Sequence, residues 1–391
     1  MDTSEKLRAR YLVGARRIVV KVGTGVLIGG GALLDGGRVG ALGDQIARLV
    51  QDGRQVALVS SGAIAAGMGE LGLAARPHTL PGLQAAASVG QTNLMGLYET
   101  ALHRHGMHAG QVLLTREDFD ARDRYLNAAN TIHELFSLGC VPVINENDTV
   151  STDEIKFGEN DVLAALVTHL ICAEALILLT SVPGLYAAGP CPEAILSLHD
   201  GPAPGGQSVA DVVTEVTDEV MGLAGDEKTP LGLGGMGSKL EAARIAVEAG
   251  EAAVIADGGD PQALTRIMAG ERVGTLFVPA EKRLRSRKRW IRFTSRPRGS
   301  VMADAGARRA LCERGRSLLP SGVTAVEGEF GPGDVVRIVG PGGEEFARGL
   351  SNYSSADIAL IKGLKTSRIE SALGYKYYDE IIHRDNLVLL G

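Results

Sequence analysis

The sequence of 391 residues has little of what marks secreted, membrane or metal-binding proteins. Its four cysteines, Cys140, Cys172, Cys191 and Cys312, are scattered without metal-binding spacing, and three stand in apolar or mixed surroundings that predict buried thiols. No 18 consecutive residues are apolar, and no apolar segment of signal-peptide type precedes Ile18. We therefore expect a cytoplasmic protein without a membrane segment, a disulfide framework or a metal held by cysteine.

Common catalytic motifs are missing as well. The glycine-rich turn after Lys21 fits neither the G-x-x-x-x-G-K-[ST] phosphate loop nor a G-x-G-x-x-G turn that opens a helix. No Ser/His/Asp or Cys/His arrangement is visible, and we interpret His103, His105 and His108 as a solvated helix end rather than a metal site. The sequence thus favours a reaction that needs neither a catalytic histidine nor a catalytic cysteine.

Composition and charge divide the chain. The residues are 45% apolar with 52 glycines and few aromatics, which suits an α/β protein. The formal net charge of the chain is −6, but it is unevenly divided. Residues 282–391 hold 20 basic and 12 acidic side chains and so carry +8, which leaves −14 on residues 1–281. We predict a first domain over residues 1–281, a basic linker over 282–296, and a small β-rich barrel with a tail over 297–391.

Strands, glycine turns and helices alternate through the first domain. This alternation predicts a doubly wound, mainly parallel sheet covered by helices. We expect helices over 39–52 and 84–109, a flap followed by a helix over 116–134, and a surface excursion over 187–210. Strands are expected to begin at Arg17 and at Gln55, to cover residues 108–115, 141–144 and 252–259, and to cover 175–186 with a break at Pro183-Gly184.

The segment from Val141 to Leu166 carries the strongest chemical signal. A buried strand ends in Asn145–Asp148, and Glu159–Asp161 open a helix, with Asn160 as its expected N-cap. Ligands bind at the carboxyl ends of strands in such sheets, so both clusters are candidates for a site. The alternative, that they only cap and turn the chain, stays open.

Two lysines strengthen the first interpretation. Lys21 ends an apolar strand, and Lys239 follows the glycine turn Gly232–Gly237. Ser60 and Ser61 end another strand, where they either bind an anion or cap a helix. Lysines, backbone N–H groups and acidic clusters at one sheet edge are typical of phosphoryl transfer. The pattern predicts a nucleotide-dependent kinase without a P-loop.

The chain resembles the bacterial glutamate 5-kinase family in several motifs: KVGTGVL, VSSGAIAAG, VINENDTV, KFGENDVL, TSVPGLY, GGMGSK and GEFGPGDVVRIV. This resemblance runs over almost the whole chain. It implies an amino acid kinase fold over the first 280 residues or so and a PUA domain near residues 297–375.

The resemblance also implies an activity, which is transfer of the ATP γ-phosphate to the side-chain carboxylate of L-glutamate, the first step of proline biosynthesis. It implies that Lys21 and Lys239 neutralise the phosphates, that Asp161 holds both lysines, and that Mg²⁺ rides on the phosphates with waters. Ser61, Asp148 and Asn160 would bind glutamate. The implied nucleotide-binding residues are Lys21, Thr180, Ser181, Leu233, Gly234, Gly235, Met236, Gly237, Ser238 and Lys239.

Some positions depart from the family pattern. Ser181 stands where Asp is common, Gly189-Pro190 replaces Asp-Pro, and Leu233 replaces Thr, all on the nucleotide side. The family further implies inhibition by proline, a dimer or tetramer, and a glutamyl phosphate reductase as a possible partner. Two rival functions stay open: RNA binding through the basic C-terminal part, and a kinase of the same fold with another acceptor.

Overall fold

The computed structural model describes residues 2–28, 33–151, 160–187, 191–199, 208–224, 235–279, 291–292 and 296–390. The chain divides into two compact units, Met1–Arg283 and Leu284–Gly391. Each unit has its own sheet and its own hydrophobic core.

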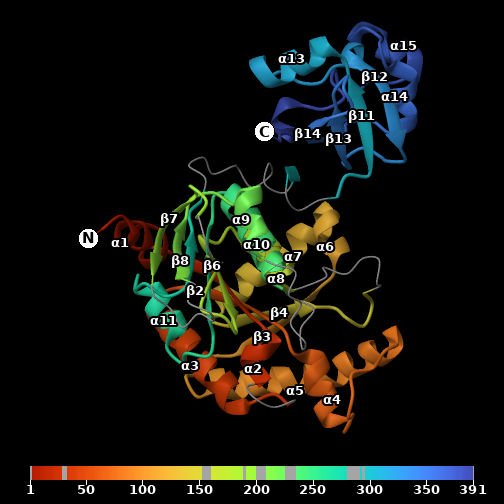
Figure 1. The fold of residues 1–391 in the computed structure, drawn as a ribbon. Helices are drawn as coiled ribbons and strands as arrows, with labels where there is room; N and C mark the ends of the chain where they lie inside the picture. Colours follow the sequence, from red (N-terminus) through yellow and green to blue (C-terminus); the bar gives the residue numbers. More distant parts are fainter. Residues whose placement is uncertain are drawn as a thin grey trace. The chain divides into compact units, whose positions relative to one another are not determined.

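The first unit is built on a ten-stranded sheet with the order β3-β4-β2-β1-β5-β9-β10-β8-β6, to which β7 is added beside β8 (Figure 1). The six strands from β3 to β9 in this order are parallel, and β10 runs antiparallel to β9. The strands are β1 (Arg17–Val22), β2 (Gln55–Ser60), β3 (Ala109–Leu114), β4 (Val141–Glu146), β5 (Ala175–Thr180), β6 (Tyr186–Ala187), β7 (Ile195–His199), β8 (Ser208–Val213), β9 (Ala252–Asp257) and β10 (Thr275–Phe277).

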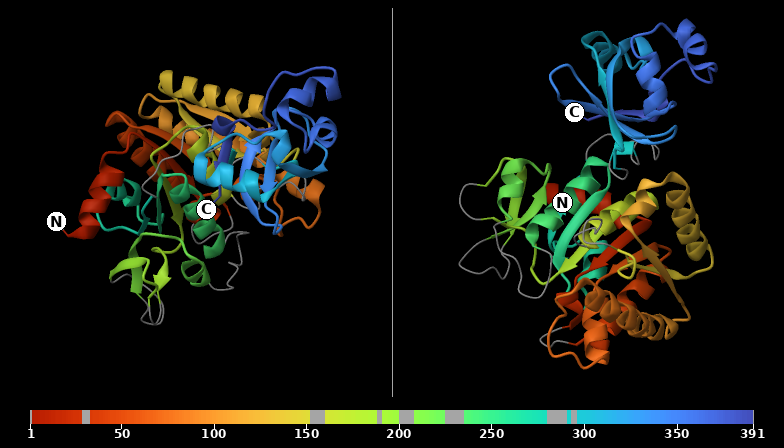
Figure 2. Two further views of the ribbon diagram at one scale, coloured as in Figure 1. Left: turned by 90° about the horizontal axis from the view of Figure 1, so that it is seen from above. Right: turned by 90° about the vertical axis from the view of Figure 1, so that its right-hand side faces the viewer.

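Helices cover both faces of this sheet, with α3 and α5 on one side and α8 and α10 on the other (Figures 1 and 2). The sequence expectation of a helix-covered, mainly parallel sheet is confirmed. The helices are α1 (Thr3–Arg8), α2 (Thr24–Ile28), α3 (Gly36–Gln51), α4 (Ala63–Glu70), α5 (Leu80–His103), α6 (Arg116–Asp120), α7 (Arg122–Ser137), α8 (Asn160–Leu170), α9 (Asp218–Gly222), α10 (Met236–Glu248) and α11 (Ala263–Met268).

Strand β1 shows how the sheet assigns its side chains. Ile18, Val20 and Val22 belong to a core cluster that also holds apolar residues of α3 and α5. Because side chains alternate along a strand, Lys21 points to the other face, where α8 packs. The apolar pattern of the strand therefore places one buried lysine on the α8 side.

Several local expectations were wrong. The flap expected at 116–134 is helical: α6 is held by a capping box between Thr115 and Asp118, and α7 follows at once. The helix expected over 84–109 begins at Leu80 and ends at His103, so Ala109 already belongs to β3. Of the excursion expected at 187–210, the described parts include β7 and the start of β8, a buried strand held by ladders to three neighbours.

One buried arginine anchors the N-terminal segment of the chain. Arg8 ends α1 and is fully buried. Its guanidinium donates to the Asp211 carboxylate at 2.8 Å and to the carbonyl oxygens of Glu271, Val273 and Gly274 at 2.7 to 3.2 Å. The pair ties α1 to the β8–β10 side of the sheet.

The second unit contains a five-stranded sheet with the order β12-β11-β13-β14-β15 and a core of its own. The short strands expected from the glycine and proline punctuation are present, while β11 and α13 were not anticipated. The elements are β11 (Gly299–Ala303), α13 (Ala305–Arg314), β12 (Val323–Gly328), β13 (Val335–Val339), β14 (Glu345–Leu350), α14 (Ser355–Ile361), α15 (Ile369–Leu373) and β15 (Leu387–Leu389).

None of the helices in the described residues combines the length and the apolar character that a membrane crossing requires.

Candidate active site

Polar side chains gather where the parallel strands of the first unit end. β1 ends next to Lys21, β2 ends at Ser60, β4 ends at Glu146 after Asn145, and β5 ends at Thr180. These four strands are neighbours in the order β4-β2-β1-β5 and run parallel, so their carboxyl ends meet at one edge. The cluster that begins at Asn145 therefore lies at this edge, and Asn160 of the second cluster contacts it there, whereas Glu159 lies outside the described residues.

Asp161 stands at the centre of this site. Its side chain is fully buried, with one carboxylate oxygen 2.6 Å from the Lys21 ammonium and the other 3.3 Å from the Lys239 ammonium. Ser238 donates a hydrogen bond of 2.9 Å to the oxygen that faces Lys239. The structure thus joins Lys21, Lys239 and Asp161 in one ion cluster.

The electrostatics of the cluster keep this carboxylate ionised. Burial alone would raise the pKa of Asp161, but the positive charges of Lys21 and Lys239, with hydrogen bonds from Lys21 and Ser238, outweigh it and lower the pKa to about 2. Lys21 and Lys239 are themselves only 6% and 7% exposed. Within the part of the chain that the structure describes, two buried cations therefore share one anion, and the cluster attracts further negative charge.

The helix dipoles stabilise one charge of the ion cluster and destabilise another. Asp161 lies in the first turn of α8, where the partial positive charge of a helix start stabilises a carboxylate. Lys239 lies in the first turn of α10, where the same effect disfavours a cation. Asp161 and the carbonyl oxygen of Gly235, 3.2 Å away, hold the Lys239 ammonium against this field.

Asn160 links the ends of two strands, β2 and β4, to the ion cluster. Its side-chain amide donates to the Ser60 carbonyl at 2.9 Å, to the Ser61 hydroxyl at 3.0 Å and to the Asn145 side-chain oxygen at 2.9 Å. The residue is the first of α8 rather than its expected N-cap, and its amide serves these contacts instead. Since Asn160 precedes Asp161, the Ser61–Asn160 pair and the lysine pair are adjacent.

A buried tyrosine supports this arrangement from below. Tyr98 of α5 and Ser60 are both fully buried, with 2.8 Å between their hydroxyl oxygens. Because the Ser60 hydroxyl donates its proton to the Ser61 carbonyl at 3.0 Å, the Tyr98 hydroxyl is the donor to Ser60. Burial raises the pKa of Tyr98, so the phenol keeps that proton. Nothing in the sequence singled out Tyr98 or this role for Ser60.

Asp148, the third residue predicted to bind glutamate, lies at the same edge of the sheet. Asp148 is half-buried in the turn that follows β4. The turn is closed by backbone hydrogen bonds from Val150 and Ser151 to Asn147, and the Ser151 hydroxyl donates to Glu146 at 2.7 Å. Glu146, which the sequence left without a role, thus shapes the turn that carries Asp148.

The predicted nucleotide residues lie beside the ion cluster where the structure describes them. Thr180 is buried at the end of β5, and Ser181 is exposed next to Gly25 of α2, the short helix that follows β1. Gly235 caps α10, and Met236, Gly237 and Ser238 form its first turn, so the expected glycine turn is partly helical. Leu233, Gly234, Gly189 and Pro190 lie outside the described residues.

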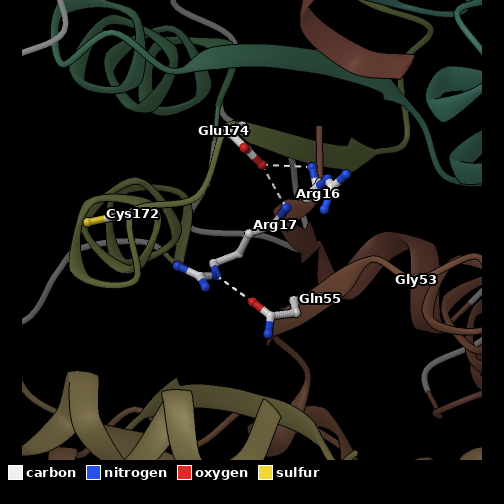
Figure 3. Close-up of a pocket in the computed structure, with 6 residues that line it drawn as sticks. All are labelled: Arg16, Arg17, Gly53, Gln55, Cys172 and Glu174. Carbon is white, nitrogen blue, oxygen red and sulfur yellow. Dashed lines mark hydrogen bonds between the residues drawn. The ribbon is translucent and has the colours of Figure 1, made fainter. Parts of the chain in front are cut away.

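A cavity of about 370 Å³ lies at the opposite edge of the sheet, where β1, β2 and β5 begin (Figure 3). There the Glu174 carboxylate accepts the backbone N–H groups of Arg16 and Arg17 at 2.7 Å, and the Arg17 guanidinium donates to Gln55 at 2.7 Å. Because these groups bind one another and join three strand starts, we assign this cavity a structural role.

All four cysteines carry free thiols, but the expectation that three are buried was wrong. Cys140 and Cys172 are half-buried, and Cys191 and Cys312 are exposed. Cys172 alone among the non-glycine residues described has a positive φ, 54°. None of the four stands among the contacts given for the ion cluster.

This geometry suits phosphoryl transfer. The barrier of such a reaction is mostly charge repulsion and alignment, so the protein must supply fixed positive charge and a binding edge rather than a nucleophile. Lys21 and Lys239 supply the charge, Asp161 fixes their separation, and the strand ends supply hydrogen-bonding groups.

Comparisons with known proteins agree. The amino acid kinase family profile matches residues 16–257, more than half of the chain, and the PUA domain profile matches residues 299–373. A protein named glutamate 5-kinase from Geobacter sp. strain M21 is 48% identical over 386 residues, which cover 98% of this chain and 100% of that protein. The chain belongs to the amino acid kinase family, in its glutamate 5-kinase group.

Other members of the group are similarly close. Glutamate 5-kinase of Moorella thermoacetica is 47% identical over 96% of this chain and 97% of its own length, and that of Geobacter sulfurreducens is 46% identical over 98% and 100%. The resemblance seen in the motifs is thereby confirmed over both units. We refer to Met1–Arg283 as the kinase unit and to Leu284–Gly391 as the PUA unit.

Proposed function

We propose that the protein transfers the γ-phosphoryl group of ATP to the side-chain carboxylate of L-glutamate, giving L-glutamyl 5-phosphate for proline biosynthesis. The observation that carries this proposal is the buried carboxylate of Asp161 between the ammonium groups of Lys21 and Lys239. The group of glutamate 5-kinases to which the chain belongs supports the choice of acceptor.

The chemistry needs no general base. The glutamate carboxylate is ionised at neutral pH, because its ordinary pKa is about 4.3. One of its oxygens attacks the γ-phosphorus, the new O–P bond forms, and the bond to the bridging oxygen of ADP breaks with its electron pair. Two anions must meet in this step, so the lysines contribute by lowering their repulsion. The lack of a catalytic histidine is consistent with this chemistry.

The substrate positions follow from the two halves of the edge. Ser61 and Asn160 offer hydrogen bonds to the glutamate, and Asp148 offers a carboxylate to its ammonium group. Lys21 and Lys239 face the transferred phosphoryl group from either side of Asp161. Thr180, Ser181 and the start of α10 line the nucleotide side.

The residues fit a magnesium ion that arrives with the nucleotide. The oxygens of Asp161 face Lys21, Lys239 and Ser238, so we assign this carboxylate to the lysines rather than to a metal. Mg²⁺ prefers phosphate oxygens and water, and when bound it neutralises phosphate charge. The chain's part is to hold the lysines where the phosphates lie.

The wider proposal includes a cytoplasmic location, a homo-oligomer and inhibition by proline. The free thiols are compatible with a reducing compartment. Proline shares the α-carboxylate and the charged nitrogen of glutamate, so the residues proposed for these groups suit both. A rate that stays flat as proline is added would remove that part of the proposal.

The decisive assay traps the acyl phosphate. With ATP and Mg²⁺ present, hydroxylamine should yield a glutamyl hydroxamate, together with ADP release that depends on glutamate. Aspartate, N-acetylglutamate and UMP serve as competing acceptors in parallel reactions. Faster turnover of one of these, or no product with glutamate, would contradict the proposed acceptor.

A further inference from the structure

Two histidines and a carboxylate converge far along the chain from the ion cluster, where α5 ends and β3 begins. Glu99 and His103 are four residues apart on α5, so their side chains share one helix face. His108 immediately precedes β3. One donor atom from each of these three residues lies within 4.8 Å of the other two.

The turn between α5 and β3 holds His108 over the last turn of the helix. His105 and Met107 donate backbone hydrogen bonds of 2.9 and 3.2 Å to the Leu102 carbonyl, and Gly106 donates one of 2.9 Å to His103. Gly106 has a φ of 72°, which a residue with a side chain adopts only with strain. The approach of His108 to the helix is therefore built into the backbone.

The carboxylate is oriented toward the histidines. One oxygen of Glu99 accepts the backbone N–H of Ala109 at 2.8 Å. The other is 2.8 Å from His108 Nδ1 and 4.0 Å from His103 Nδ1. A hydrogen bond to the second oxygen of a ligating carboxylate is the outer support that protein metal sites use.

In place of the solvated helix end that the sequence suggested, we propose that Glu99, His103 and His108 bind one divalent transition-metal ion of the Zn²⁺ type. Two imidazole nitrogens and one carboxylate oxygen suit Zn²⁺ and its neighbours, whereas Mg²⁺ prefers oxygen alone. Zn–N bonds of about 2.0–2.1 Å place tetrahedral ligands about 3.3 Å apart, so the distance of 4.0 Å from Glu99 to His103 would shorten and that of 2.8 Å to His108 would lengthen slightly. The side chains of His103 and His108 are 69% and 63% exposed, which leaves them free to rotate.

Binding connects two elements of the kinase unit. The ion takes the place of the hydrogen bond between His108 Nδ1 and Glu99, with the neutral imidazole carrying its proton on Nε2, and it joins the last turn of α5 to the start of β3. Water completes the coordination. Because the ion binds the folded unit, its concentration raises the midpoint temperature Tm of unfolding by mass action.

The test is a titration of the full chain, stripped with a chelator, with Zn²⁺ in excess Mg²⁺. Calorimetry should show one saturable site, and Tm should rise with Zn²⁺. His103→Ala and His108→Ala should each weaken binding by about 100-fold, since loss of an outer partner of a metal ligand already weakens it about 10–100-fold. Glu99→Gln, which keeps an acceptor for Ala109, should fall between these variants and the wild type.

The matched control is His105→Ala. His105 lies in the same turn, but its Nε2 is 2.8 Å from Asp44 and it is not part of the cluster, so its loss should leave Zn²⁺ binding unchanged. The proposal is overturned if the wild type shows no saturable site. It is also overturned if His103→Ala binds Zn²⁺ as tightly as the wild type, or if His105→Ala loses binding to the same extent.

Discussion

Arg8 and Lys239 are both buried cations of the kinase unit, but their surroundings differ in completeness. Arg8 donates to its own carboxylate partner, Asp211, and to several carbonyl oxygens around it. Lys239 shares Asp161 with Lys21, so among the described residues two cations have one anion between them. We call Arg8 with Asp211 the closed group, because its two charges balance. We call Lys21, Lys239 and Asp161 the incomplete group, because one positive charge is left over among these three residues.

Burial alone does not distinguish a structural cation from a functional one, because Arg8 and Lys239 are both buried, whereas their charge balance does distinguish them. Transfer of a charge from water into the protein interior costs free energy. A buried cation that serves only stability offsets this cost when each of its N–H groups has an acceptor, as in Arg8. Excess charge in a buried site is tolerated where a ligand completes it. The ion cluster at the strand ends fits this description, since a phosphoryl group brings the missing negative charge.

The largest expected effect comes from opening the closed group. Arg8→Ala should lower the free energy of unfolding of the kinase unit by about 3–5 kcal/mol, because Asp211 is left buried without its partner. Denaturant titration measures this. Arg10→Ala, at an exposed position two residues later, should change stability by less than about 0.5 kcal/mol. Equal losses in the two variants would refute the assignment.

Opening the incomplete group should affect the rate instead. Lys239→Ala and Lys21→Ala should each lower kcat by about 100- to 1000-fold, as removal of one transition-state donor does elsewhere. Stability should change little, because Asp161 keeps the other lysine. Arg244→Ala, on the exposed side of α10, is the control. Unchanged kcat with a raised KM would make the lysines binding residues instead.

Acid should expose the stabilising contribution of Asp161. Its folded-state pKa of about 2 lies below the ordinary 3.8, so the unfolded chain binds more protons between these values. The stabilisation of about 2 kcal/mol is present above about pH 4 and is lost as pH falls through about 2. The gap in unfolding free energy between wild type and Asp161→Asn should therefore narrow between about pH 5 and pH 2. As a control, the exposed Asp218→Asn should change the unfolding free energy at neutral pH by less than about 0.5 kcal/mol.

The sequence predicted the incomplete group better than the closed one. Lys21 is visible because a lysine at the end of an apolar strand needs a partner, and the polar clusters at Asn145 and Asn160 are visible from their place after a strand and before a helix. Arg8 was not visible. Its partners are more than 200 residues away in the chain, and a charged N-terminal segment is typical of a loose arm.

Strands and supports that depend on distant contacts were missed for the same reason. β7 and β8 lie in or next to a stretch rich in Pro, Gly and Ala, and β8 is a strand because β7 and β10 pair with it. Tyr98 stands within a helix where a tyrosine has no special pattern. The contact between Tyr98 and Ser60 depends on how α5 packs against the sheet, and the local sequence does not encode this packing.

The smallest expected effect tests that hidden support. Tyr98→Phe removes the donor to Ser60 and should lower the free energy of unfolding by about 1 kcal/mol. Because Ser60 and Ser61 accept from Asn160, the KM for glutamate should rise while kcat stays near the wild-type value. Tyr11→Phe, which removes a hydroxyl without a described partner beside the same core, should change neither. A fall in kcat with constant KM would contradict this prediction, because it would mean that Tyr98 supports the phosphoryl-transfer step, as the lysines do, rather than glutamate binding.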